Sequence, residues 1–155
     1  MKDHSKAASA VENNLNLLIS DISILQEKLF NQQLRLHGEI TLSRAQAQVL
    51  ALLAPRDGLT QTEVLEQLSI EKSALASLMT NMENNGWITR RADSKDKRSK
   101  RVYLTDKIWQ HSDTLSKVAE FSAQTALAGF SNKERQLLLE QLSTIRQQLK
   151  TALSK

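Results

Sequence analysis

The sequence contains no cysteine among its 155 residues. It therefore cannot form a disulfide bond, a thiolate zinc site, a cysteine nucleophile or a thiol-based redox switch. Long hydrophobic runs are also missing, since the longest, residues 49–54, is much shorter than the ~20 residues that a membrane-spanning helix needs. Residues 1–14 are polar and lack the hydrophobic centre of a signal peptide. We expect a cytoplasmic chain that does not enter a membrane.

Residues that interrupt helices are scarce, with four glycines and one proline in the whole chain. Hydrophobic residues recur at spacings of three and four, which is typical of amphipathic helices rather than strands. The 40% hydrophobic and 25% charged residues match the composition of a globular domain that buries a core. These features predict a mainly helical protein.

Both ends of the chain carry long hydrophobic stripes. The first lies in a helix over about residues 11–36, and the last lies in a helix that begins at Ser131 with Glu134 as its capping partner. Another helix is expected to begin after Thr105 and to continue to Phe130. A small monomer would struggle to bury both stripes, so we expect them to form core or a dimer seam, with a coiled-coil partner of another kind as the alternative. The stripe residues are Leu15, Leu18, Ile22, Leu25, Leu29 and Leu36, then Leu138, Leu142, Ile145, Leu149 and Leu153.

Two shorter helices are predicted in the middle of the chain from their capping residues. Ser43 and Gln46 have the spacing of a capping box, and the helix that they start ends before the turn at residues 55–58. Thr60 and Glu63 repeat this spacing at the start of the next helix. Each helix carries hydrophobic residues on one side, so we expect them to pack together.

A fourth helix and a β-hairpin follow. The helix is predicted over residues 72–84, with Gly86 as the left-handed residue that ends it. Residues 87–91 and 101–104 are short and compatible with strands, and the polar residues 92–100 between them predict a hairpin loop.

Positive charge is concentrated in this hairpin. The chain has a net charge of +4, and residues 90–101 alone contain seven basic and two acidic residues, a local charge of +5. The rest of the chain is therefore close to neutral. A polyanionic partner is expected at the hairpin, although charged runs are often only solvated surface.

Two helices joined by a tight turn and followed by a basic hairpin form a winged helix-turn-helix. The major groove of DNA admits one helix, so the second helix must be exposed on one face and held from behind. Leu68, Ile70, Leu75 and Met79 are predicted to form that inner packing. The candidate DNA-binding residues are Gln61, Lys72, Ser73, Ser77 and Asn81 on the helices, and Lys95, Lys97, Arg98 and Lys100 on the hairpin.

The sequence resembles the multiple-antibiotic-resistance regulator (MarR) family of winged helix-turn-helix transcription regulators. The resemblance covers nearly the whole chain and is most specific in the hairpin. It rests on Leu42-Ser43-x-x-Gln46, Leu59-Thr60, Met82-Glu83-Asn84-Asn85-Gly86-Trp87-Ile88-x-Arg90, Asp96-Lys97-Arg98 and Val102-x-Leu104-Thr105.

The resemblance implies roles for three residues of the hairpin. It implies that Arg98 reaches toward the minor groove and that Asp96 orients it, with Arg90 as a second orienting residue. It also implies a homodimer that binds pseudopalindromic double-stranded DNA and acts as a regulator, most often a repressor.

The resemblance also implies a division of the chain. Residues 1–36 and 105–155 would form a helical dimerisation region, and residues 37–104 the DNA-binding region. The expected fold class is mainly α, with a small β-hairpin wing and terminal dimerisation helices.

The sequence departs from the family in its reading helix. Many relatives have Thr-Arg where this chain has Ala76-Ser77, and Asp-Arg where it has Thr80-Asn81. The helix therefore offers no arginine for a bidentate hydrogen bond to guanine. Glu71 stands where relatives often have a capping serine. We interpret these changes as a shift of affinity toward the wing, with more dependence on A·T content and DNA shape.

Relatives commonly bind small aromatic or lipophilic anions between the dimerisation helices and the winged helix. By position, the candidates for such an effector here are His37, Arg44, Trp109 and His111. Packing or solvent contact is the favoured role for each of them. The three histidines, which include His4, show no metal-ligand spacing, so no metal site is expected.

No catalytic motif is recognisable. The sequence has no glycine-rich phosphate loop, no nucleophilic serine or histidine motif and no pair of carboxylates at catalytic spacing. We expect neither an enzyme nor a cofactor. Two alternatives to an operator-binding regulator stay open. One is a MarR-like dimer that acts by binding another protein, and the other is an effector-binding sensor with weak or nonspecific DNA affinity.

Overall fold

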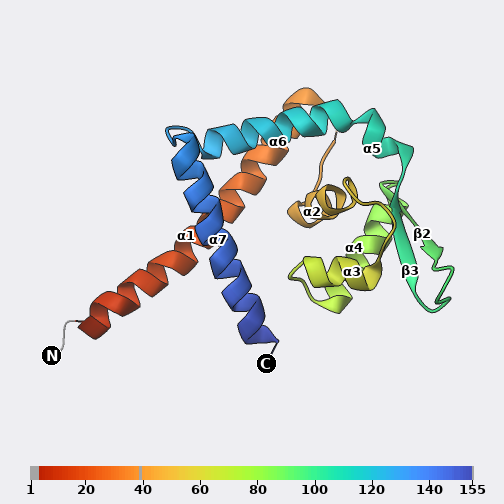
Figure 1. Cartoon of the computed structure of the whole chain (residues 1–155). Helices are drawn as coiled ribbons and strands as arrows, with labels where there is room; N and C mark the ends of the chain where they lie inside the picture. Colours follow the sequence, from red (N-terminus) through yellow and green to blue (C-terminus); the bar gives the residue numbers. More distant parts are fainter. Residues whose placement is uncertain (1–3, 39, 155) are drawn as a thin grey trace. The chain divides into compact units, whose positions relative to one another are not determined.

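The computed structural model describes residues 4–38 and 40–154, with side chains from residue 14 onward (Figure 1). Helices dominate these residues and a small antiparallel sheet accompanies them, which confirms the predicted fold class. The described residues divide into two compact units, one ending at Ala119 and the other beginning at Glu120. The elements are α1 (His4–His37), α2 (Arg44–Leu53), β1 (Leu59–Thr60), α3 (Gln61–Gln67), α4 (Lys72–Asn84), β2 (Ile88–Ala92), β3 (Lys100–Leu104), α5 (Asp106–Gln110), α6 (Ser112–Ala126) and α7 (Asn132–Leu153).

Three helices begin where their capping boxes predict. Ser43, Thr60 and Ser131 each accept a hydrogen bond from the backbone three residues later, and the side chain at that third position bonds back to the cap. These reciprocal bonds satisfy two backbone donors that a helix start leaves unpaired. Helix α4 covers the predicted residues, and Gly86 has the left-handed φ of 72° that ends it. The local sequence thus determines these helix boundaries.

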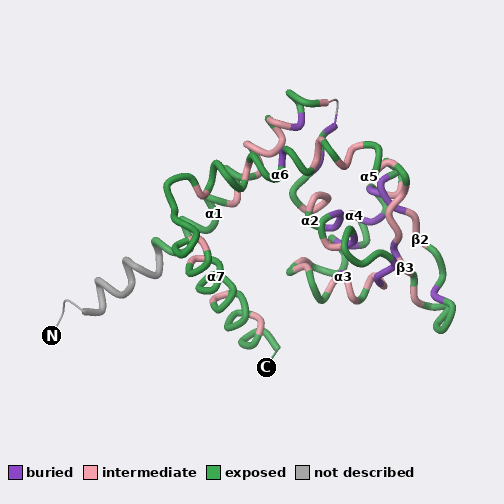
Figure 2. Tube along the Cα trace, turned by 45° about the horizontal axis from the view of Figure 1, so that its top comes forward, coloured by how far each residue is buried: buried purple, intermediate pink, exposed green. Residues whose placement is uncertain are grey.

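The hydrophobic core of the first unit lies among α2, α3, α4 and the strands (Figure 2). Leu75 and Met79 of α4 are fully buried, and Leu68 and Ile70 pack against the same core from the turn before it. This confirms the predicted inner packing. Leu34, near the end of α1, is also fully buried in this core. The end of α1 therefore contributes to the core of this first unit.

The sheet has three strands rather than the predicted two. Its order is β1-β3-β2, and Val102 of β3 pairs with Leu59 of β1 on one side and with Arg90 of β2 on the other. Strand β1 has only two residues, too few to show an alternating pattern in the sequence. Strands β2 and β3 each lie within one residue of their predicted bounds.

Two predicted helix bounds are wrong. Helix α1 begins at His4 and not near residue 11. The single helix expected between Thr105 and Phe130 is instead divided at His111 and ends at Ala126. Hydrophobic residues keep the spacing of a helix across His111, so the sequence pattern gives no sign of the break. The ring of His111 packs 5.8 Å from the ring of Trp87, a contact that only the folded chain can make.

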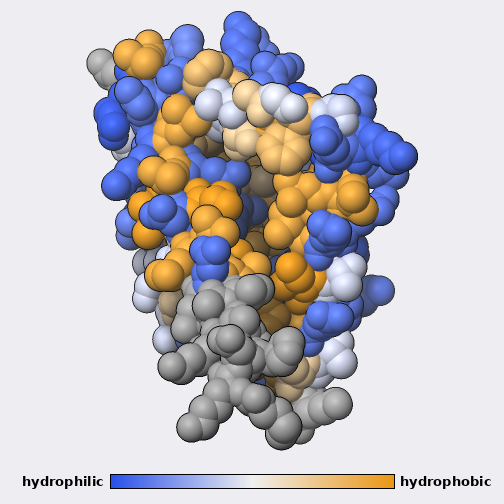
Figure 3. Space-filling view, turned by 90° about the vertical axis from the view of Figure 1, so that its left-hand side faces the viewer, coloured by the Kyte–Doolittle hydropathy of each residue, from blue (hydrophilic) through white to orange (hydrophobic). Residues whose placement is uncertain are grey.

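Helix α7 leaves its stripe uncovered. None of its described residues is buried, and Leu142 and Leu149 are 43% and 61% exposed. In α1, Leu18 and Ile22 are likewise about half exposed. Figure 3 shows such hydrophobic side chains gathered in patches on the face that it draws. Among the described residues, no helix is both long and hydrophobic enough to cross a membrane.

Gly58 lies between α2 and β1, where the ring of Tyr103 leaves little room for a larger side chain. Gly58 has a φ of 79°, and a Cβ there would lie 2.8 Å from Cε1 of Tyr103. We expect Gly58→Ala to lower the free energy of unfolding by roughly 1–2 kcal/mol for the left-handed backbone and by roughly 1–3 kcal/mol more for the clash.

The matched control is Gly86→Ala, because Gly86 has a similar φ of 72° but open space around a Cβ. Urea denaturation of the three proteins checks this expectation. Equal losses of stability in the two variants would contradict a close packing of Tyr103 on Gly58.

Candidate nucleic-acid interface

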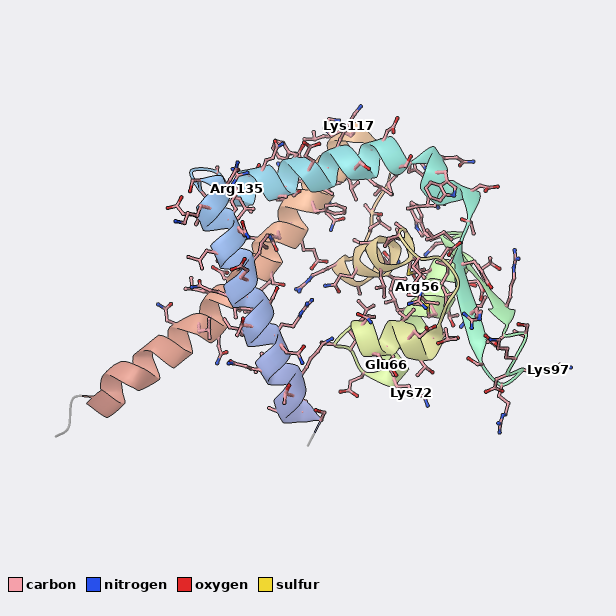
Figure 4. The ribbon with its side chains drawn as sticks, viewed as in Figure 1. Arg56, Glu66, Lys72, Lys97, Lys117 and Arg135 are labelled. Atoms are coloured by element: carbon pink, nitrogen blue, oxygen red, sulfur yellow. The ribbon has the colours of Figure 1, made fainter. Side chains whose placement is uncertain are left out.

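The exposed face of α4 is made of short polar side chains. Ser73, Ser77 and Thr80 are exposed, and Lys72 stands at the start of the helix (Figure 4). Since each residue turns the chain by about 100°, these three side chains lie opposite the buried Leu75 and Met79. Glu71 is the N-cap but makes no side-chain capping bond. Thr80, which the sequence analysis did not select, belongs to this face.

Asn81 lies at the side of α4 that meets α2. Its Oδ1 accepts hydrogen bonds from Nε2 of Gln46 at 2.7 Å and from Nδ2 of Asn85 at 3.0 Å. Gln46 also belongs to the capping box of α2, so one side chain joins the start of α2 to α4. The side-chain oxygen of Asn81 is therefore already hydrogen-bonded within the protein. Gln61, another predicted DNA-binding residue, is half-buried at the first position of α3.

Arg90 joins the base of the hairpin to α4. Its Nε and Nη2 atoms donate to Oε2 of Glu83 at 2.9 and 2.6 Å, and its backbone N–H donates to Oε1 at 2.9 Å. The Nη2 atom also lies 3.4 Å from the hydroxyl of Thr80. These bonds to Arg90 lower the pKa of Glu83 below its ordinary value of 4.5. The guanidinium of Arg90 therefore braces β2 against α4.

Asp93 organises the loop of the hairpin, and the sequence analysis missed it. Its side chain is buried, and its Oδ1 accepts the backbone N–H groups of Lys95 at 2.6 Å and Asp96 at 3.0 Å. These two bonds are the main cause of its lowered pKa, to which the neighbouring Arg101 also contributes. An aspartate that accepts backbone bonds two and three residues ahead is a common turn former, so its sequence position did carry a clue.

Arg101 connects the hairpin to the helix-turn-helix. Its Nε donates to Oδ2 of Asp93, and its Nη1 donates to the carbonyl of Gly58 at 2.8 Å. On the neighbouring strand, the guanidinium of Arg91 lies 5.2 Å from the centre of the Tyr103 ring. Two of the seven basic residues in this segment, Arg90 and Arg101, are thus paired with carboxylates inside the fold.

Apart from Arg91, the remaining cations of this segment lie at the outer part of the hairpin. Lys95, Lys97 and Lys100 are exposed and make no ion pair with the described residues. Arg98 is 94% exposed, and Asp96 accepts hydrogen bonds from its backbone at 3.0 Å and its Nε at 3.5 Å. Figure 4 shows Lys97 at the outer end of the hairpin. The contact between Asp96 and Arg98 fits the orienting role that the resemblance implies, and that role stays a prediction.

A groove of about 540 Å³ lies between α1 and the segment before α2. Its rim carries Lys28 and Arg35, and its lining includes Ile24, Leu42 and Ser43. Oε1 of Glu27, also in the lining, accepts the backbone N–H of Arg44 at 3.2 Å.

The four predicted effector residues do not line this groove. His37 and Arg44 are exposed, Trp109 is 62% exposed, and His111 is half-buried against Trp87. Their effector role stays a prediction. No group of three or more metal-ligating side chains occurs among the described residues.

Comparison with known proteins identifies the family. A model described as the MarR family matches residues 40–99, which run from the end of α1 to the hairpin. The transcriptional regulator HosA of Escherichia coli is 31% identical over 90 residues, which cover 52% of this chain and 67% of HosA. The chain belongs to the MarR family. Members of this family are transcription regulators, and the chain has the winged helix-turn-helix of a DNA-binding regulator.

Other relatives agree with this MarR assignment. The transcriptional regulator YdgJ of Bacillus subtilis is 28% identical over 105 residues, and the match spans 68% of this chain and 64% of YdgJ. A MarR transcriptional regulator from Methanosarcina mazei has a TM-score of 0.76 at 22% identity, covering 90% of this chain and 99% of its own. Reduced AbfR in a structure bound to DNA has a TM-score of 0.73 at 19% identity, covering 94% of this chain and 97% of AbfR. The two structures show a shared fold.

The ion pair between Glu83 and Arg90 predicts a pH dependence of stability in this MarR protein. The pKa of Glu83 is lowered in the folded protein, and the unfolded chain has the ordinary value of 4.5. The stabilising effect of Glu83 is therefore complete above pH 4.5, and it is lost as the pH falls through the lower pKa of the folded protein.

We expect Glu83→Gln to be less stable than the wild type at pH 7, by up to about 1 kcal/mol. This difference should shrink as the pH falls below 4.5. Urea denaturation at pH 7 and pH 3.5 measures it. Glu71→Gln is the control, because it removes the same charge from the same helix without breaking an ion pair. A difference between wild type and Glu83→Gln that does not change with pH would contradict the expectation.

Proposed function

We propose that this chain binds pseudopalindromic duplex DNA as a homodimer and represses transcription, with α4 in the major groove and residues 92–100 in or near the minor groove. One observation carries the proposal. An exposed, polar α4 is braced by Arg90 and Glu83 to a hairpin whose outer part carries unpaired lysines. A helix and a cationic hairpin in one rigid piece can contact two neighbouring grooves at once.

The distribution of charge supports a polyanionic partner. Arg90 and Arg101 are neutralised by carboxylates of the protein, whereas Lys95, Lys97 and Lys100 face solvent. Each lysine that pairs with a phosphate releases a counterion, so the affinity should fall steeply with salt. AbfR, which shares this fold, is known in a structure bound to DNA. Duplex DNA as the partner also fits the predicted cytoplasmic location.

The exposed stripes of the terminal helices support the homodimer. Leu142 and Leu149 of α7 and Ile22 of α1 expose large hydrophobic surfaces that isolated monomers rarely leave in water. A two-fold axis would place two α4 helices about one turn of DNA apart, ~34 Å, and would explain a pseudopalindromic operator. The dimerisation region, residues 1–36 and 105–155, is part of this proposal.

The groove beside α1 supports a small effector of the predicted chemical class. It combines the cations Lys28 and Arg35 with the hydrophobic side chains of Ile24 and Leu42, which suits a lipophilic or aromatic anion. Ser43 of its lining is the N-cap of α2, and the capping partner Gln46 bonds to Asn81 of α4. A series of hydrogen bonds through Ser43, Gln46 and Asn81 therefore connects the groove to α4.

Two alanine variants of the hairpin test DNA binding. We expect Arg98→Ala to weaken binding of a selected operator by about 10- to 100-fold, because an arginine in the minor groove contributes both charge and shape recognition. We expect Lys97→Ala to lower the salt dependence by about one phosphate contact per subunit. A mobility-shift assay over a series of salt concentrations measures both effects.

Lys117→Ala is the control for the loss of one charge, because Lys117 is an exposed lysine of α6 away from the hairpin (Figure 4). Unchanged binding by both hairpin variants would contradict the proposed interface. If the wild type shifted no DNA at low salt, binding to another protein would be favoured. Equal affinity for palindromic and scrambled duplexes would favour a sensor with nonspecific DNA affinity.

A glutamate in the stripe of α7 tests the homodimer. We expect sedimentation to show the wild type at twice the 17.4 kDa of one chain. Leu142→Glu should shift the protein to monomers and abolish tight operator binding, because it places a charge in the seam. Leu137→Glu is the matched control, since Leu137 is also exposed but lies about 120° round α7 from the centre of the stripe. A Leu142→Glu protein that stayed dimeric would exclude this stripe as the seam.

A further inference from the structure

From Ser73 to Thr80, the exposed side chains of α4 include none that usually distinguishes bases. These two turns expose Ser73, Ala74, Ala76, Ser77 and Thr80. Arginine commonly recognises guanine through two hydrogen bonds from its guanidinium. Asparagine or glutamine recognises adenine through two hydrogen bonds, one from the amide NH₂ group and one to the amide oxygen. Neither arginine nor glutamine occurs in α4.

The groups nearby that could supply such contacts are occupied. Oδ1 of Asn81 already accepts bonds from Gln46 and Asn85, so its amide cannot pair with adenine at both ends without breaking them. The guanidinium of Arg90 is held by Glu83, and it also contacts the hydroxyl of Thr80. From Ser73 to Thr80, the structure therefore leaves α4 with methyl groups and single hydroxyls toward a DNA groove, and the exposed amide of Asn84 lies one turn further along.

This surface matches one feature of the major groove. Thymine alone among the four bases carries a methyl group there, and the methyl groups of alanine and threonine pack against it. Ala76 and Thr80 are one turn apart, about 6 Å along the helix, which is close to the separation of two base-pair steps of DNA. Small side chains also let the helix backbone approach the bases closely.

We propose that α4 recognises its half-site through the C5-methyl groups of thymine, with Ala76 as the main contact. The inference rests on the proposed binding of duplex DNA and adds the chemical feature that is recognised. The hydroxyls of Ser73 and Ser77 lie to one side of this contact around the helix and bond to base edges or phosphates. The hairpin contributes affinity and recognition of groove shape, because the minor groove displays no methyl group.

Uracil provides a direct test, because it pairs as thymine does and lacks only the methyl group. The 155-residue chain first selects its operator from random duplexes. The thymines of that operator are then replaced by deoxyuridine, one symmetric pair of positions at a time, and affinity is measured by mobility shift. Removing one contacted methyl group should weaken binding about fourfold, and removing it from both half-sites about fifteenfold.

Ala76→Gly shows whether α4 makes this contact. This variant should bind thymine and uracil operators equally at the sensitive positions. Glycine also weakens the helix itself, so Ala74→Gly is the matched control. Ala74 is an exposed alanine of the same helix, about 160° round from Ala76, and its replacement should leave the preference for thymine intact.

The outcomes separate this inference from the proposed function. Failure of the wild type to select any duplex would overturn DNA binding itself. Tight, selective binding that is unchanged by every uracil substitution would overturn methyl recognition and leave DNA binding intact. A preference for thymine that persists in Ala76→Gly would overturn the assignment to Ala76.

Discussion

The surface that α4 and the hairpin share depends on one ion pair, that between Arg90 and Glu83, because it joins the two elements at the base of the hairpin. The guanidinium donates to Oε2 of Glu83 from two nitrogens, and the backbone N–H of Arg90 reaches the other carboxylate oxygen. Three bonds in different directions fix the angle between β2 and α4 more firmly than a single bond could. Any surface that α4 and the hairpin offer together has the geometry that this pair sets.

A second set of bonds fixes the hairpin from its other side. Asp93 holds the loop through backbone N–H groups, and Arg101 links Asp93 to the carbonyl of Gly58 before β1. Buried charges of this kind are tolerated only when they are paired and hydrogen-bonded. Arginines of the basic segment are thereby divided between scaffold and surface. The cations that remain for a nucleic acid are Arg91 and those of the outer hairpin.

This division separates affinity from specificity. Lysines on the outer hairpin attract any polyanion, and the interaction weakens with salt. Small side chains on α4 contribute little attraction, but they require a close fit to whatever enters the space beside them. A protein of this design would locate DNA through the hairpin and select among sequences through α4. In the proposed complex, the bonds of Arg90 and Arg101 would hold both surfaces so that they contact the same duplex.

Much of the fold could be predicted from local sequence. Capping boxes set three helix starts because their bonds span only three residues, and the hydrophobic spacing of α4 identified its buried face before any contact was known. The positions of the candidate DNA-binding residues on α4 and on the hairpin followed from the same patterns. Elements shaped by distant residues escaped prediction, as strand β1 and the break at His111 show.

The sequence by itself determined which segments form helices, where the cations are and that the family is MarR. Only the tertiary structure decided which of those cations remain available. Arg90 and Lys97 look alike in the sequence, yet one is bound to Glu83 and the other extends into solvent. The availability of Asn81 was also decided by the fold, because its side-chain oxygen accepts a hydrogen bond from Gln46, which is 35 residues away in the sequence. Side-chain identity is local information, whereas the pairing of charges and amides depends on which distant segments the fold brings into contact.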